Sequence, residues 1–181
     1  YYGVAKGIGG EMAVSIYGIV NRIAMFAFFP LIGIAQGMMP IVGYNFGAKQ
    51  FDRVKEVVRI AVIWGFAIAG LIASLLLGFS DYIPGIFNNE ALLLEHTPTA
   101  IFWVFLATPL LILPLVGATY YQAIGKGLSA LLLTLTKQGF FLIPIVLILP
   151  NYFGLEGVWY SFTIADVLSA AVCYYFLVNG L

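Results

Sequence analysis

Long apolar stretches separated by short polar or glycine-containing connections make up most of this chain. Each stretch exceeds the roughly 20 residues that a helix needs to cross a hydrocarbon core about 30 Å thick. The pattern predicts five transmembrane helices, at about residues 11–44, 54–79, 99–124, 128–149 and 155–177. A bilayer offers the backbone no hydrogen-bond partners, so we expect an all-α, polytopic membrane bundle in which residues 1–181 form a single membrane domain.

The distribution of charge fixes the expected orientation of these helices. Lys49, Arg53, Lys55 and Arg59 supply four of the eight Lys and Arg residues within the first connection, whereas residues 80–97 carry acids and no Lys or Arg. Under the positive-inside rule, the first connection is cytoplasmic. Alternation then predicts a cytoplasmic carboxyl terminus in a multi-pass protein of the cell (inner) membrane. An odd number of spans further suggests one more span before Tyr1, which would complete a six-helix unit.

Composition narrows the class of function. Hydrophobic residues make up 62% and charged residues 9% of the chain, whereas soluble domains carry about 25% charged residues. Acidic and basic residues balance, so nucleic acid is not an expected partner. The chain contains no phosphate-binding loop, nucleophile elbow, metalloprotease motif or metal-ligand cluster, so we expect neither an enzyme nor a bound cofactor or metal.

A polar and small-residue stripe runs along the first apolar segment. It consists of Gly18, Arg22, Met25, Phe29, Gly33, Gln36 and Pro40. Three- and four-residue spacing places these side chains on one helical face, and polar groups avoid lipid, so the stripe should face inward. It either packs against a neighbouring helix, or it lines a substrate cavity through Asn21, Met25, Phe29 and Gln36. Met and aromatic side chains suit the second role because they repack around varied ligands.

Prolines interrupt two of the later segments. Pro109 and Pro114 each remove a backbone donor from the third segment, which predicts either a tolerated kink or a broken helix beside a cavity. Helical spacing puts Thr108, Thr119 and Gln122 on one face, so Thr108 and Gln122 join the candidate cavity residues. A glycine-containing outer turn is expected at residues 150–154.

Two opposite charges are expected deep within the last two segments. Asp166 lies about ten residues, roughly 15 Å, below the outer end of its helix, and Lys137 about twelve residues, roughly 18 Å, below that of its own. A short turn joins these helices, so Asp166 should pair with Lys137, with Arg22 as a competing partner. The pair is either structural or the site of charge coupling, where Asp166 takes up a proton as substrate leaves.

Several motifs together resemble the multidrug and toxic compound extrusion family. They are Asn21-Arg22, Gln36-Gly37, Pro40, Gly43, Asn45, Gly47-Ala48, Gln122 to Lys126, Ile143-Pro144 and Gly154 to Trp159. The resemblance implies most of the second lobe of a twelve-helix transporter, with membrane lipid and a missing amino-terminal lobe as partners. It also implies secondary active efflux of cationic or amphipathic drugs in exchange for sodium ions or protons. Two alternatives are a lipid-linked oligosaccharide flippase of related fold and a nontransporting membrane assembly subunit.

Overall fold

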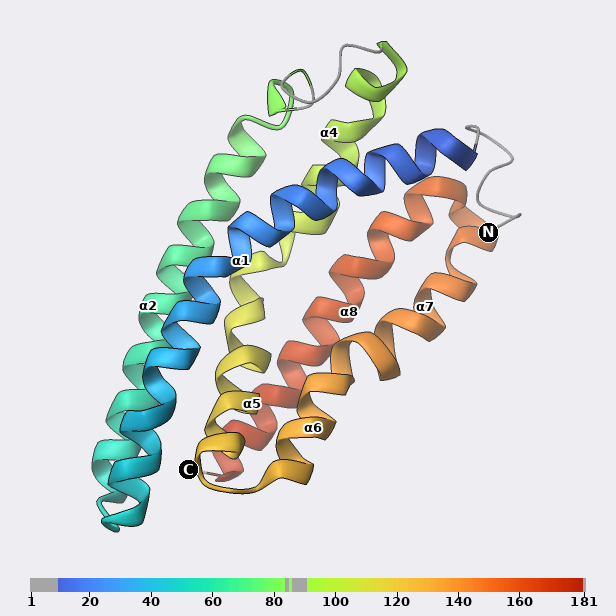
Figure 1. The fold of residues 1–181 in the computed structure, drawn as a ribbon. Coiled ribbons are helices and arrows are strands. Elements are labelled where there is room, and N and C mark those ends of the chain that lie inside the picture. The colour runs from blue at the N-terminus through green and yellow to red at the C-terminus, as the bar shows by residue number, and fades with distance from the viewer. Residues whose placement is uncertain (1–9, 84, 86–90, 181) are drawn as a thin grey trace.

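All secondary structure in the described part of the chain is helical. The computed structural model describes residues 10–83, 85 and 91–180. The α-helices are α1 (Gly10–Gly47), α2 (Phe51–Gly78), α4 (Ala91–Leu106), α5 (Ile112–Ala123), α6 (Gly127–Leu135), α7 (Ile143–Ile148) and α8 (Pro150–Gly180) (Figure 1). A 3₁₀ helix, η2 (Thr108–Leu111), precedes α5, and a π-helix, η3 (Thr136–Leu142), joins α6 to α7. The predicted all-α fold class is confirmed.

The helices of the described residues account for five membrane crossings when one bent pair is counted as a single span. Four continuous stretches are long and apolar enough to span a bilayer: Val14–Gly47, Phe51–Gly78, Gly127–Ile148 and Pro150–Gly180. The fifth crossing is a pair, Glu95–Leu106 and Thr108–Ala123, whose halves are bent by 42° to each other. The count matches the sequence-based expectation when the bent pair is taken as one crossing.

Helix α1 continues through both of its prolines, Pro30 and Pro40, to Gly47, three residues beyond the predicted end. Figure 1 shows that the helix bends along its length, so Pro30 deflects the helix without ending it. The turn that follows places Lys49 at a positive φ of 58°. The Gln50 amide then donates to the Asn45 carbonyl, 2.9 Å away, and α2 begins at Phe51 rather than near residue 54.

The third crossing is broken where the prolines fall, which corrects the expectation of one helix over 99–124. Helix α4 ends at Leu106, and Pro109 lies within the 3₁₀ turn that follows. The last four carbonyls of a helix have no N–H partner within that helix, so the carbonyls at the end of α4 need other partners. The Thr163 hydroxyl of α8 donates to the Trp103 carbonyl of α4 and so supplies one of them.

The fourth and fifth crossings also depart from single regular helices. The predicted helix over 128–149 is α6, η3 and α7 in succession, with a π-helical segment in the middle. Helix α8 begins at Pro150, earlier than the predicted residue 155. At Gly154 the backbone leaves helical geometry, with φ 60° and ψ −137°, so the predicted outer turn survives as a break inside α8.

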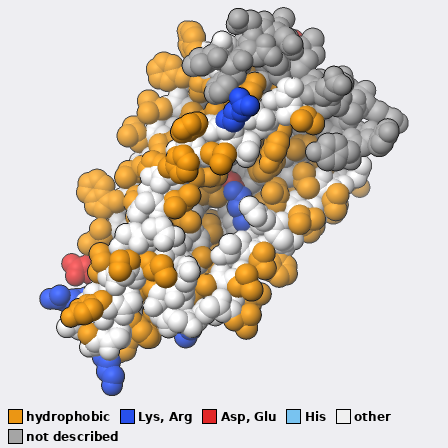
Figure 2. Space-filling model, viewed as in Figure 1, with side chains coloured by type: hydrophobic (Ala, Val, Ile, Leu, Met, Phe, Trp, Pro, Cys, Tyr) orange, Lys and Arg blue, Asp and Glu red, His pale blue; other side chains and the backbone are white. Residues whose placement is uncertain are grey.

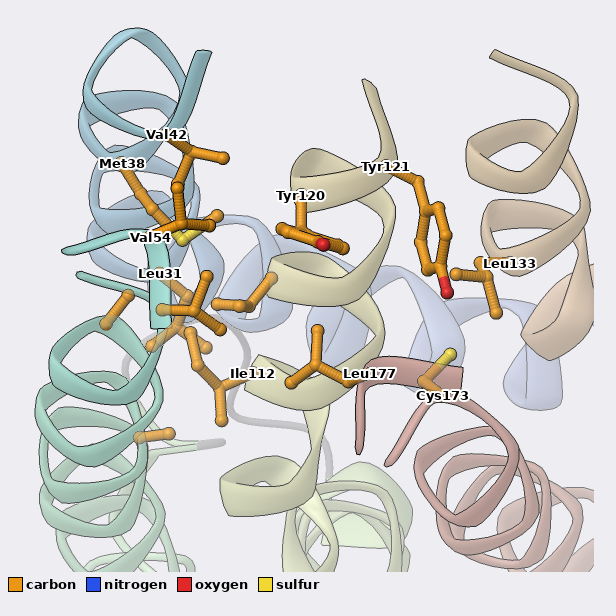
Figure 3. Packing of buried hydrophobic residues seen from close by; sticks show 14 residues of the cluster. Leu31, Met38, Val42, Val54, Ile112, Tyr120, Tyr121, Leu133, Cys173 and Leu177 are labelled. Carbon is orange, nitrogen blue, oxygen red and sulfur yellow. The ribbon is translucent and has the colours of Figure 1, made fainter. Parts of the chain in front are cut away.

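The broken crossing lies at the centre of the bundle, because α4, η2 and α5 between them contact α1, α2, α6 and α8. Figure 3 shows one hydrophobic cluster around α5, in which Met38, Ile112 and Leu177 converge from three crossings. A second cluster joins α1, α4 and α8 nearer the amino-terminal end of α1. The hydroxyls of Tyr120 and Tyr121 donate to the carbonyls of Gly180 and Phe176, at 2.6 and 2.8 Å, and so tie the end of α8 to α5.

Candidate functional site

One face of α1 has no partner among the described helices, and we call it the open face. It carries Asn21, Arg22, Met25, Phe29, Gly33 and Gln36. Met25 is 57% exposed and Phe29 is 58% exposed, and a Cβ added at Gly33 would meet nothing within 4 Å. The predicted stripe therefore packs against no helix of the described chain. The opposite face of α1, with Ile23, Leu31 and Met38, forms its contacts with the bundle instead.

The three polar residues that the sequence placed on one face of the third crossing differ in burial. Thr108 is fully buried at the start of η2, and its hydroxyl has no hydrogen-bond partner among the described residues. Thr119 is buried in α5 and donates to the Leu115 carbonyl at 2.8 Å. Gln122 is exposed at the end of α5. Thr119 and Gln122 are three residues apart in α5 and so share a face, whereas Thr108 precedes α5 in the 3₁₀ turn. That Thr108 and Gln122 line a cavity stays a prediction.

Lys137 and Asp166 form an ion pair in the interior of the membrane-spanning region. The Lys137 Nζ lies 2.6 Å from the Asp166 Oδ1, and the side chains are 22% and 2% exposed respectively. No second donor contacts this oxygen among the described residues. The predicted pairing is confirmed. Arg22, the competing partner, is exposed on the open face and forms no ion pair with any described residue.

The surroundings of the pair come from three crossings. Lys137 belongs to the π-helical turn η3, Asp166 to α8, and the Phe28 ring of α1 has its centre 5.9 Å from the Lys137 Nζ. Figure 2 shows a basic side chain with an acidic one beside it about half-way along one face, set among uncharged side chains. The pair therefore links η3 and α8 and reaches toward α1.

Two residues of this region were not identified from the sequence. Phe28 neighbours Phe29 but belongs to a different face of α1, and nothing in a run of apolar residues indicates which one meets Lys137. Thr163 donates to the Trp103 carbonyl in the last turn of α4. Nothing in the sequence pattern indicates which carbonyl this hydroxyl meets.

In the described residues, four apolar crossings around a broken central one define a multi-pass helical membrane protein. The MatE family model matches residues 3–148, and the chain belongs to this family. It is 30% identical over 164 residues to the multidrug export protein MepA of Staphylococcus aureus, and 26% identical over 164 residues to that of Staphylococcus saprophyticus. Each match covers 89% of this chain but 35% of the relative, so the chain spans about a third of the length of these proteins.

Solved structures give the same picture. A multidrug resistance MATE family transporter of the MOP superfamily, in an outward-facing conformation, superimposes with a TM-score of 0.90 at 22% identity, over 97% of this chain and 40% of the other. The MATE multidrug transporter DinF-BH superimposes with a TM-score of 0.83 at 40% identity, over 92% of this chain and 37% of the other. The fold is thus that of part of a MATE transporter, and the resemblance seen in the motifs is confirmed.

Proposed function

We propose that this chain forms most of the carboxyl-terminal lobe of a secondary active multidrug exporter. The complete protein exports cationic or amphipathic compounds across the cell membrane in exchange for sodium ions or protons. The names of its relatives support this proposal, since MepA is a multidrug export protein and DinF-BH a multidrug transporter. The amino-terminal lobe of the same protein and the surrounding lipid are the partners that the proposal requires.

The open face of α1 is the observation that carries the proposal. A membrane helix that faces lipid avoids polar and charged side chains, because each costs free energy in hydrocarbon. The open face nevertheless presents Asn21, Arg22 and Gln36 beside the adaptable Met25 and Phe29. Such a face suits a polar pathway with a broad range of ligands, and in the complete protein it borders the substrate cavity.

The flippase alternative has less support from the charges of this chain. A carrier for a lipid-linked oligosaccharide needs a strongly cationic cavity to hold a pyrophosphate group. Lys137 is neutralised by Asp166 at 2.6 Å, which leaves Arg22 on the open face. The charges of this chain therefore fit a drug exporter better than a flippase.

Gly33→Leu in the complete protein tests the role of the open face. The new side chain has free space beyond Gly33, so it leaves the packing of the described helices unchanged and projects where substrate would pass. We expect export of cationic dyes from proteoliposomes to fall sharply while the protein remains folded. Gly70→Leu is the matched control, because a Cβ at Gly70 of α2 also meets nothing within 4 Å.

Two outcomes would count against the proposal. Export by Gly33→Leu at the parental rate would show that the open face does not border the substrate path. A complete wild-type protein that exports no dye under either a sodium or a proton gradient would instead favour the nontransporting alternative.

A further inference from the structure

We propose that Lys137 and Asp166 are a proton-operated charge pair, in which Lys137 is a tethered cation that leaves the Asp166 carboxylate when that carboxylate takes up a proton. The inference rests on the proposed function and deepens it, because it makes the proton the coupling ion and assigns the site where it binds.

The carboxylate is held by a single contact. An ionised carboxylate can accept about four hydrogen bonds, and buried ion pairs with a structural role are favourable when further hydrogen bonds complete them. Asp166 Oδ1 receives the Lys137 ammonium at 2.6 Å and no other donor among the described residues, although the side chain is 2% exposed. The charge of Asp166 therefore depends on one neighbour, and loss of that neighbour favours the neutral acid.

The lysine has a second neighbour that attracts a cation, in addition to Asp166. Its side chain is 22% exposed, and the Phe28 ring centre lies 5.9 Å from Nζ, within reach of a cation–π contact. Lys137 is also part of the π-helix η3, and π-helical turns inside α-helices are rare and frequent at functional sites. The ammonium can thus exchange an acceptor on α8 for an aromatic face on α1.

No other ionisable side chain shares this environment in the described chain. Helices α6 and α7, which pack against η3, carry none. On α8 the nearest are Tyr160 and Cys173, six and seven residues from Asp166, so each is roughly 9 to 10 Å away along the axis. On the helices packed against α8, the ionisable groups lie at the ends: Glu95 and His96 on α4, and Tyr120 and Tyr121 on α5. Arg22 of α1 is exposed on the open face.

Because no other ionisable side chain shares this environment, protonation of Asp166 decides where the Lys137 ammonium lies. A proton adds to the Asp166 carboxylate and gives the neutral acid, so the attraction for Lys137 is lost while the total charge of the pair rises by one. The ammonium moves toward Phe28, whose neighbour Phe29 belongs to the open face of α1. Return of Lys137 to Asp166 releases the proton. Proton uptake on α8 is thereby linked to the helix that borders the substrate cavity in the proposed function.

A double substitution separates this role from a purely structural one. Asp166→Asn with Lys137→Gln removes both charges together, so neither partner is left with an unpaired charge. If the pair were only structural, the double variant of the complete protein would still accumulate dye under a proton gradient. We expect it to bind dye and exchange it without a gradient, but to lose gradient-driven accumulation. Glu156→Gln is the matched control, since Glu156 is an exposed carboxylate on the same helix, and it should behave as wild type.

A measurement on the unaltered protein covers the case in which the double variant does not fold. Hydrophobic carbodiimides modify protonated carboxyl groups inside membranes, and mass spectrometry locates the adduct. We expect modification of Asp166 to increase as the pH falls and to abolish proton-driven export. An Asp166 that stays unmodified at every pH, or a double variant with parental proton-driven accumulation, overturns the inference. In either case dye export by the wild type still stands, so the proposed function is judged separately.

Discussion

Helices α1 and α2 are both long, apolar and packed on the same central crossing, yet they present different surfaces outward. The outward side of α2 is apolar and includes Ile63, Trp64 and Leu71. The open face of α1 combines exposed apolar side chains, such as Met25 and Phe29, with the exposed polar residues Asn21 and Gln36. An exposed apolar face suits contact with lipid, whereas an exposed face that carries polar side chains does not. Under the proposed function, we expect α2 to lie at the lipid boundary and α1 at the boundary with the rest of the transporter.

The largest expected difference between the two faces concerns charge. Leu71→Asp puts a carboxylate in the lipid-facing run of α2, where insertion costs about 2.5 to 3.5 kcal/mol at the bilayer centre. Gln36→Asp on the open face should cost much less, since that position is already polar. The amount of folded, membrane-inserted protein and its unfolding temperature measure the difference. Leu71→Ala is the control that shortens the side chain without adding a charge. Equal losses of folded protein for both acidic variants would contradict the proposed difference between the two faces.

A second difference concerns the room beside glycine. A Cβ at Gly65, on the buried side of α2, would overlap the Ile112 side chain of α5, whereas a Cβ at Gly33 meets nothing within 4 Å. Gly65→Leu should therefore destabilise the protein by about 1 to 3 kcal/mol through overpacking. Gly33→Leu should leave stability close to that of the wild type. Thermal unfolding in one detergent compares them, and a destabilised Gly33→Leu would mean that the open face is packed.

A smaller effect is expected from the tyrosine hydroxyls that bond the end of α8 to α5. Tyr121→Phe removes the hydrogen bond to the Phe176 carbonyl, and such a bond contributes about 0.5 to 1.5 kcal/mol. Tyr44→Phe, at an exposed position of α1, is the control and should have little effect. Equilibrium unfolding measures the difference in free energy of unfolding between the two variants. No difference would mean that apolar contacts alone hold α8 to α5.

Cysteine labelling should change stability least and report the two faces most directly. Met25→Cys on the open face should react with a water-soluble maleimide in the complete protein, and substrate should slow the reaction. Leu71→Cys should stay unreactive in the bilayer. The native Cys173 is buried, so it should contribute little to the labelling signal. Matching reaction rates at the two positions would show that neither outward face borders water.

The sequence by itself determined the fold class and the five crossings, and it predicted the Lys137–Asp166 pair with Arg22 as a competing partner that the structure then excluded. A run of apolar residues long enough to cross a bilayer has few structural alternatives, because the backbone must satisfy its own hydrogen bonds there. The depth of Lys137 and Asp166 followed from the constant rise of a helix, and one acid and one base at similar depth favour each other. These conclusions need no knowledge of how the helices pack.

The tertiary structure decided which faces meet. It placed the stripe of α1 on the open face, buried Thr108 while leaving Gln122 exposed, and put Lys137 on a π-helical turn within reach of Phe28. Hydrophobic periodicity identifies the buried side of a helix only when water surrounds the protein. In a membrane, both the lipid-facing and the buried sides are apolar, so the shapes of side chains and the breaks at Pro109 and η3 choose among faces that the sequence pattern leaves equivalent.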